Sequence, residues 1–235
     1  MSPFATLHTL STILHARVTK SLAVANLNKL TLEIPSDFVY GVTNKSPSYL
    51  AKFPHGKIPA LETPSGFYLS ESTAIAQYLA ESGPYKDQLL GRTVEERALV
   101  QMWISLADTS IFIDAGPIIS QVTGRGSYAS GFLVDKEEQF MRAVKRVEVH
   151  LAQEGKVWLV RDDEFSLADL SVASALYWPL KFFMDGKCRE QIPNVMKWWE
   201  RLLSIEEVKK GFEGPVELCE VRPPFDGSLL QARKD

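Results

Sequence analysis

Almost all the segments of this sequence that favour a β-strand lie in the first third of the chain. Short apolar runs that favour strands alternate there with apolar residues at helical spacing. The strand segments are 4–10, 30–34, 59–62 and 67–69, and the helical ones are 16–27, 46–51 and 72–80. The last two strand segments flank Thr63-Pro64-Ser65-Gly66, which has the composition of a hairpin turn. This order predicts a small sheet that mixes parallel and antiparallel pairs.

Beyond residue 82 the sequence is helical almost throughout. Ser82-Gly83-Pro84 breaks the last helix of the first third, and the segment that ends at Arg92 has the character of a linker. A hydroxyl or acidic residue followed three positions later by an acidic one predicts each of three helix starts, at Thr93, Asp135 and Ser166. A further helix is predicted over 193–203. Gly116-Pro117 is expected to interrupt or end the helix that starts at Thr93.

Composition and charge exclude several classes of function. The 26 Lys and Arg residues are outnumbered by 29 Asp and Glu, and the net charge of −3 argues against nucleic-acid binding. No apolar run approaches the roughly 20 residues that span a bilayer, so no membrane partner is expected. We also expect no signal peptide, and Cys188 and Cys219 cannot form a disulfide framework, which favours the cytosol. His8 and His15 lack a third ligand at useful spacing, so no metal site is predicted.

The stretch from Lys57 to Ser72 has the features of a peptide-binding site. A cis bond at Ile58-Pro59 would turn the N–H and C=O of Ile58 out of the sheet, where an extended peptide could pair with them. Ser72 begins a predicted helix, whose free N–H groups and hydroxyl suit a carboxylate. The carboxylate of Glu71 would pair with an ammonium group. An extended backbone, a free carboxylate and an amine together describe a short peptide of the glutathione kind.

Two longer stretches carry a resemblance to a known family. Residues 44–62, NKSPSYLAKFPHGKIPALE, and residues 69–79, LSESTAIAQYL, resemble the glutathione transferases. The resemblance is closest to the fungal branch related to the amino-terminal part of elongation factor 1B gamma, and it covers nearly the whole chain. It implies a thioredoxin-like, glutathione-binding α/β domain at 1–82 and an all-helical domain at 91–215. Between them lies a linker at 83–90, and an irregular tail follows at 216–235.

The resemblance implies which residues hold the two amino-terminal parts of glutathione. Ile58 would bind the cysteinyl part through its backbone, with Pro59 in the cis form. Glu71 and Ser72 would hold the gamma-glutamyl end. Lys57 lies two residues before the proline, where the family often places a side chain near the glutathione backbone.

The same resemblance implies candidates for the glycyl carboxylate. Lys45 is the main candidate and Asn44 an additional one. His55 is close enough in sequence to share this role.

The group that would activate the glutathione thiol is the point where this sequence departs from the family. The family uses a Tyr, Ser or Cys just after the first strand, and this chain has no Tyr or Cys before Tyr40. Ser11 and Thr12 are the available hydroxyls and are the predicted catalytic residues. The loop between Leu10 and His15 is about two residues longer than the fungal pattern, which leaves Ser11, Thr12 and His15 as alternatives.

The second substrate is expected to be an apolar small molecule in a cleft between the two domains. Its predicted walls come from the loop after the first strand and from two of the predicted helices. The residues are Ile13, Leu14, Phe112, Ile113 and Tyr177.

Two functions of different kinds remain open. The first is a cytoplasmic, homodimeric enzyme that transfers glutathione to an electrophile or adds it reversibly to a conjugated double bond. Fungal relatives of this kind include natural-product tailoring enzymes, one of which isomerises a double bond from trans to cis. The second is a non-catalytic binding or scaffold module, like the transferase-shaped part of the elongation factor. The absence of a Tyr or Cys before Tyr40 favours the module, and binding to immobilised glutathione followed by a conjugation assay would discriminate between the two.

Overall fold

A computed structural model describes residues 2–125 and 129–224 of the chain. The chain divides into two compact units. The N-terminal unit contains residues up to 97 together with 203–215, and the helical unit contains residues 98–202 together with those from 216 on. All described strands belong to the first unit, and the second is helical. The predicted class, an α/β part followed by an all-α part, is confirmed.

The N-terminal unit is built around a four-stranded sheet. The strands have the order β2-β1-β3-β4, with β1 and β2 parallel and the other pairs antiparallel. This is the mixed sheet that the sequence predicts. The elements of the unit are β1 (Ala5–His8), α1 (Ala16–Leu27), β2 (Leu32–Glu33), the 3₁₀ turn η1 (Thr43–Lys45), α2 (Pro47–Lys52), β3 (Ala60–Glu62), β4 (Tyr68–Ser70), α3 (Ser72–Glu81), α4 (Lys86–Leu90) and α11 (Glu206–Gly211).

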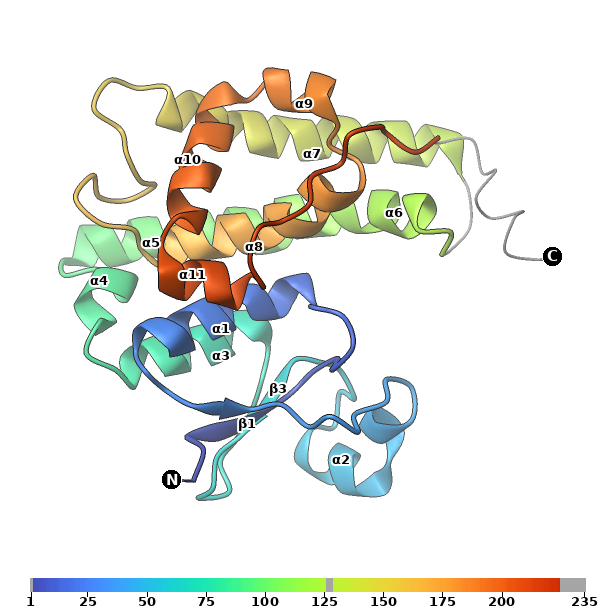
Figure 1. Cartoon of the computed structure of the whole chain (residues 1–235), viewed down its shortest axis with the longest axis vertical. Coiled ribbons are helices and arrows are strands. Elements are labelled where there is room, and N and C mark those ends of the chain that lie inside the picture. Colours follow the sequence, from blue (N-terminus) through green and yellow to red (C-terminus); the bar gives the residue numbers. More distant parts are fainter. Residues whose placement is uncertain (1, 126–128, 225–235) are drawn as a thin grey trace. The chain divides into compact units, whose positions relative to one another are not determined.

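The side chains of β1 alternate between the two faces of the sheet, and different elements pack on each face. Ala5 and Leu7 are fully buried on the face where α1 and α3 lie side by side (Figure 1). His8 points to the opposite face, because successive strand residues alternate. There its ring packs against Tyr49 of α2 and against Phe53, with both ring centroids 5.6 Å away. This aromatic packing anchors the loop that follows α2, which contains the Ile58-Pro59 bond.

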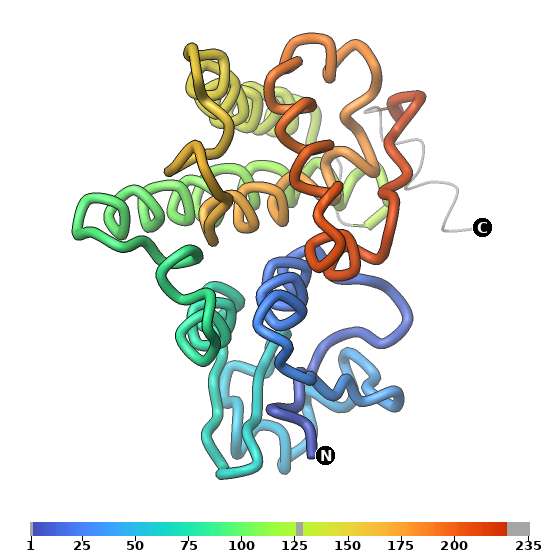
Figure 2. The backbone as a smooth tube through the Cα atoms, turned by 60° about the vertical axis from the view of Figure 1, so that its left-hand side comes forward, coloured from blue at the N-terminus to red at the C-terminus, as the bar shows by residue number. Residues whose placement is uncertain are grey.

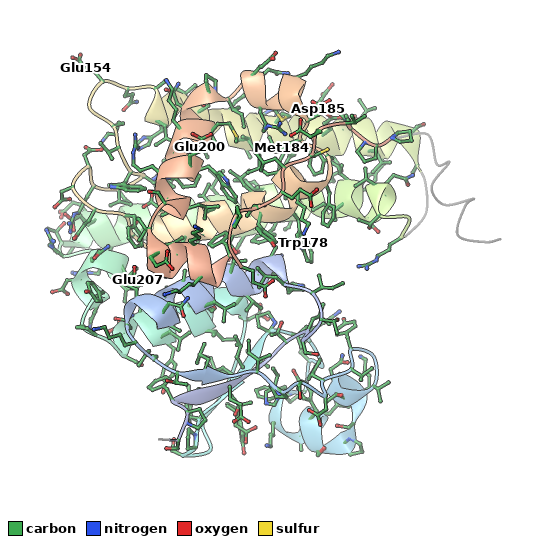
Figure 3. The ribbon with its side chains drawn as sticks, in the orientation of Figure 1. Glu154, Trp178, Met184, Asp185, Glu200 and Glu207 are labelled. Atoms are coloured by element: carbon green, nitrogen blue, oxygen red, sulfur yellow. The ribbon has the colours of Figure 1, made fainter. Side chains whose placement is uncertain are left out.

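Helix α11 returns to the N-terminal unit and packs closely on α1, as Figure 2 shows. The side-chain amide of Asn26 donates to the backbone carbonyl of Glu207, 3.0 Å away. Glu207 lies on α11 and is labelled in Figure 3. Gly211 allows α11 to approach α1 this closely. A Cβ atom at this position would lie 2.5 Å from the backbone nitrogen of Ala23 and 2.8 Å from its Cα. The glycine is therefore required by packing.

Replacing Gly211 by Ala is expected to lower the free energy of unfolding by about 1–3 kcal/mol, because the methyl group overlaps backbone atoms that cannot move independently. Gly116 is the matched control, since a Cβ there has no neighbour within 4 Å. Gly116→Ala should raise stability by up to about 1 kcal/mol through helix propensity alone. Urea unfolding of both variants tests this contrast. Equal effects at the two sites would contradict the packing explanation.

The helical unit contains the remaining elements. They are α5 (Val94–Leu106), a π-helical turn η2 (Ala107–Ile111), α6 (Phe112–Val122), α7 (Ser130–Leu151), α8 (Leu167–Phe182), α9 (Gly186–Glu190) and α10 (Pro193–Leu203). Helix α8 is buried along nearly its whole length. The predicted helix start at Ser166 is confirmed as a capping box, in which the Ser166 hydroxyl accepts from the backbone and Asp169 accepts from the backbone N–H of Ser166.

Three local predictions differ from the structure. The segment predicted as a linker contains α4, whose Leu89 and Leu90 are buried. The helix predicted to start at Asp135 begins at Ser130. Pro117 does not end its helix, which continues to Val122. A proline deprives the carbonyl four residues earlier of its partner, and here that residue, Ile113, is exposed to solvent. The irregular tail is described only to residue 224, where it contains no helix or strand; residues 225–235 lie outside the described residues.

The structure contains a continuous helical run, Val94–Val122, that bears on the expectation that no segment of this chain spans a membrane. By length and composition alone it could cross a membrane, with a mean hydropathy of 1.2 over its most apolar window. In the sequence, Pro117 and the acidic residues interrupt the apolar residues of this run, so it does not stand out as a possible membrane span. Within the helical unit, α6 and η2 pack against α7 and α8, and 39% of the apolar window is buried inside the structure. The absence of a membrane partner stays a prediction.

Candidate functional site

A cavity of about 340 Å³ in the N-terminal unit brings together most of the residues that the sequence assigns to peptide binding. Its volume is within the usual range for small-molecule sites. Four segments contribute to it: the start of α1, the loop before β3, the end of β4 and the start of α3. The lining residues are Arg17, His55, Lys57, Ile58, Pro59, Ser70, Glu71 and Ser72.

The predicted cis bond between Ile58 and Pro59 is confirmed. The hydroxyl of Tyr49 donates to the carbonyl oxygen of Lys57, 2.8 Å away, and so fixes the loop just before this bond. Burial raises the pKa of Tyr49 to about 12, which keeps the hydroxyl protonated as a donor. Within the described part of the chain, no hydrogen bond occupies the N–H or C=O of Ile58. These two groups are available to an extended peptide.

Glu71 and Ser72 form the wall at the start of α3. Glu71 has a φ of 71°, a left-handed conformation that is unfavourable for a residue with a side chain. Its carboxylate makes no capping hydrogen bond to the helix. Backbone strain of this kind tends to persist at functional positions. The Ser72 side chain is buried in the first turn of α3, where the positive end of the helix dipole attracts an anion.

Arg17, on the α1 side, is the one lining residue besides Ser70 that the sequence analysis did not single out. It occupies the first turn of α1, where the helix macrodipole disfavours a cation. That unfavourable placement is the signal that could have revealed it. One turn further along α1, the ammonium group of Lys20 is fully buried and donates to the Thr73 hydroxyl, 2.7 Å away.

His15 caps α1 immediately before Arg17. Its Nδ1 accepts a hydrogen bond from the backbone N–H of Arg17, at 3.2 Å. Burial of the ring, with a smaller contribution from the charge of Arg17, lowers the pKa of His15 to about 4. His15 is therefore neutral at physiological pH and serves as a hydrogen-bond acceptor.

This lowered pKa predicts how stability depends on pH. The unfolded chain binds a proton at His15 below pH 6.5, whereas the folded chain resists it down to about pH 4. The free energy of unfolding should therefore fall between pH 6.5 and pH 5, by about 1–2 kcal/mol from this residue. His15→Asn keeps a capping acceptor that does not titrate. Urea unfolding across this range should show a shallower pH slope for the variant, and identical slopes would contradict the assignment.

The candidates for the glycyl carboxylate lie in different places. His55 and Lys57 are exposed and line the cavity. Lys45 is exposed near Gly56 but outside the cavity lining. Asn44 is fully buried: its Oδ1 accepts from the Gly41 N–H and its Nδ2 donates to the Gly56 carbonyl. The bonds of Asn44 hold the loop together, so we assign it no ligand contact.

The predicted catalytic hydroxyls line a different cavity. Ser11 and Thr12 are exposed and line a space of about 420 Å³, together with Ile13 and Leu14. The Ser11 hydroxyl donates to the Ser36 carbonyl, 3.2 Å away. Sequence proximity to β1 suggested that these hydroxyls would face the glutathione sulfur. In the structure, the loop places them in the lining of this second cavity, whereas Arg17 lines the first.

The remaining predicted substrate residues belong to the helical unit. Phe112 is half-buried, Ile113 is exposed, and Tyr177 is buried in the core of that unit. Ile13 and Leu14 belong to the N-terminal unit. Their role as walls of one pocket stays a prediction. Among residues 2–125 and 129–224 there is no group of three or more His, Cys, Asp and Glu that could hold a metal ion.

Comparison with known proteins establishes the family. Residues 5–81 match the model of the glutathione S-transferase N-terminal domain, and residues 133–206 match that of the C-terminal domain. The chain belongs to the glutathione S-transferase family. The predicted thioredoxin-like domain and all-helical domain are thereby confirmed.

Three similar proteins illustrate where the chain falls within the family. A glutathione S-transferase-like protein of Aspergillus aculeatus is 41% identical over 202 residues, which is 86% of this chain and 94% of that protein. Elongation factor 1-gamma of Danio rerio is 32% identical over 204 residues, 86% of this chain but 44% of its own length. The structure of glutathione transferase URE2P6 from Phanerochaete chrysosporium, in complex with oxidized glutathione, has a TM-score of 0.79 at 22% identity; 90% of this chain and 96% of that one are covered. The chain thus falls in a fungal branch related to elongation factor 1-gamma.

Proposed function

We propose that the chain binds glutathione in the 340 Å³ cavity and uses its thiol on an apolar, electrophilic or conjugated small molecule. The observation that carries the proposal is the meeting of three groups in one cavity: the unpaired backbone of Ile58, the Glu71 carboxylate and the first turn of α3 at Ser72. The structure of URE2P6 in complex with oxidized glutathione, which shares the fold, supports the choice of ligand.

Each part of the tripeptide has a matching group in the cavity. The backbone of Ile58 pairs with the cysteinyl residue in the manner of an added strand. Glu71 pairs with the ammonium group of the gamma-glutamyl residue, and the Ser72 turn binds its carboxylate. Lys57 and His55, which line the same cavity, bind the glycyl carboxylate.

The reaction takes one of two forms. In conjugation, a bond forms between sulfur and carbon while a leaving group departs from the electrophile. In isomerisation, the thiolate adds to a conjugated double bond, the resulting single bond rotates, and elimination returns the thiolate with a cis double bond. A role in fungal natural-product biosynthesis, a cytoplasmic location and a homodimer complete the proposal.

A second candidate is a non-catalytic glutathione transferase-like module. It is favoured by the location of Ser11 and Thr12 outside the cavity and by the similarity to elongation factor 1-gamma. Retention on immobilised glutathione, followed by a conjugation assay with a generic aryl halide, separates the two candidates. The enzyme should be retained and should accelerate conjugation above the uncatalysed rate. Retention without turnover of this or any conjugated substrate would favour the module, and no retention would contradict both.

A further inference from the structure

Arg17 is the only residue that α1 contributes to the 340 Å³ cavity. The other three lining segments already have partners in the proposed complex. The loop before β3 faces the cysteinyl backbone and the glycyl end, whereas β4 and α3 face the gamma-glutamyl end. The glutathione sulfur is the one reactive group left without a protein partner, and α1 is the one segment left to meet it.

We propose that the Arg17 guanidinium lies against the glutathione sulfur and holds it as the thiolate. This inference rests on the proposed function, because it needs glutathione in this cavity. Arg17 then replaces the hydroxyl that other family members use, and it accounts for the absence of a Tyr or Cys before Tyr40.

The electrostatics of the α1 start favour an anion at this point. A guanidinium is charged at every accessible pH and presents several N–H donors in one plane. The first turn of α1 adds the positive end of the helix dipole. A free thiol titrates near pH 8.5, and a neighbouring arginine or helix N-terminus lowers this value to within about 3.5–7.5. The S–H bond then breaks with release of the proton to water, and no other reactant is needed.

Competing groups are less suitable. The hydroxyls of Ser11 and Thr12 line the 420 Å³ cavity instead. His15 is next to Arg17, but its pKa of about 4 makes it a poor base at neutral pH. Ser70 and Ser72 lie on the gamma-glutamyl side, at the end of β4 and the start of α3.

Lys20 adds a second positive charge on α1, outside the residues that line the cavity. It follows Arg17 by three residues on α1, a spacing that places the two side chains on one face of the helix. Its buried ammonium group donates to Thr73, the neighbour of Ser72 on α3. This bond ties the α1 start to the α3 start and fixes the geometry between the sulfur and the gamma-glutamyl end.

The test is the pKa of the bound glutathione thiol, followed by the ultraviolet absorbance of the thiolate during pH titration. Wild-type protein should lower this pKa by at least one unit from the free value of about 8.5. Arg17→Met, which keeps the aliphatic stem, should return it to within about half a unit of the free value. Arg17→Lys should give an intermediate pKa, and it provides the comparison if the Met variant does not fold. Ser11→Ala should leave the pKa as in wild type.

S-methylglutathione separates this inference from the proposed function, because it has no thiol to ionise. Its affinity should differ by less than about threefold between wild type and Arg17→Met. If wild type does not bind S-methylglutathione, the proposed function and this inference both fail. If wild type binds it but Arg17→Met leaves the thiol pKa unchanged, only the inference is overturned. A loss of S-methylglutathione affinity in Arg17→Met would also overturn it, because Arg17 would then be a carboxylate ligand.

Discussion

Replacing Glu71 by Gln is expected to weaken glutathione binding by about 10–100-fold. The substitution keeps the size of the side chain but removes the charge that pairs with the gamma-glutamyl ammonium. A hydrogen bond between charged groups contributes about 1.5–3 kcal/mol, which corresponds to this range of affinity. Isothermal titration calorimetry with glutathione measures the change.

The same variant should keep its folding stability within about 0.5 kcal/mol, because Glu71 is exposed and makes no capping bond. Glu81 provides a matched control at the other end of α3, where it forms an exposed ion pair with Lys86. Glu81→Gln removes the same charge from the same helix and should leave glutathione affinity within about twofold. Equal losses in both variants would point to a general electrostatic effect instead of a contact at Glu71.

Replacing Asp169 by Ala is expected to lower the free energy of unfolding of the protein by about 3–5 kcal/mol. The carboxylate is completely buried and accepts hydrogen bonds from four donors. These are the Leu159 N–H at 3.0 Å, the Ser166 N–H at 2.8 Å, the Ser166 hydroxyl at 3.1 Å and the Trp198 indole N–H at 2.9 Å. Alanine leaves buried donors without an acceptor, each at a cost of about 1–3 kcal/mol.

Asp185 is the control for this prediction, and Figure 3 labels it at the start of α9. It also caps a helix, by accepting from the N–H of Cys188 at 3.0 Å, but its surroundings are more exposed. Asp185→Ala should cost only about 1 kcal/mol, the usual value for an N-cap. Urea unfolding of the two variants measures the difference. A cost at Asp169 no greater than at Asp185 would contradict a structural role for the buried carboxylate network.

Local chemistry made much of the fold predictable from sequence. Helix α1 begins and ends where the apolar spacing predicts, and α10 does the same after its proline. The start of α2 follows from Pro47, which is suited to a first helical position, and from the Ser46 cap. The start of α7 at Ser130 was not predictable in this way, because Ala129 at its N-cap offers no side-chain acceptor.

The candidate site was predictable where its residues are close in sequence. Lys57, Ile58 and Pro59 form one short loop, and Glu71 with Ser72 forms one helix start, so local patterns were enough to group them. Arg17 lies about 40 residues earlier, and only the packing of α1 beside the sheet brings it to the same cavity. The direction in which the loop from Leu10 to Leu14 turns depends on tertiary contacts, such as the Ser11 bond to Ser36, that no local pattern encodes.

The most direct measurement is a crystal structure of the protein soaked with glutathione. The account predicts electron density for one tripeptide in the cavity lined by Arg17, Ile58 and Ser72, with the cysteinyl backbone paired to the N–H and C=O of Ile58. Density at another place, or an empty cavity at saturating glutathione, would contradict it.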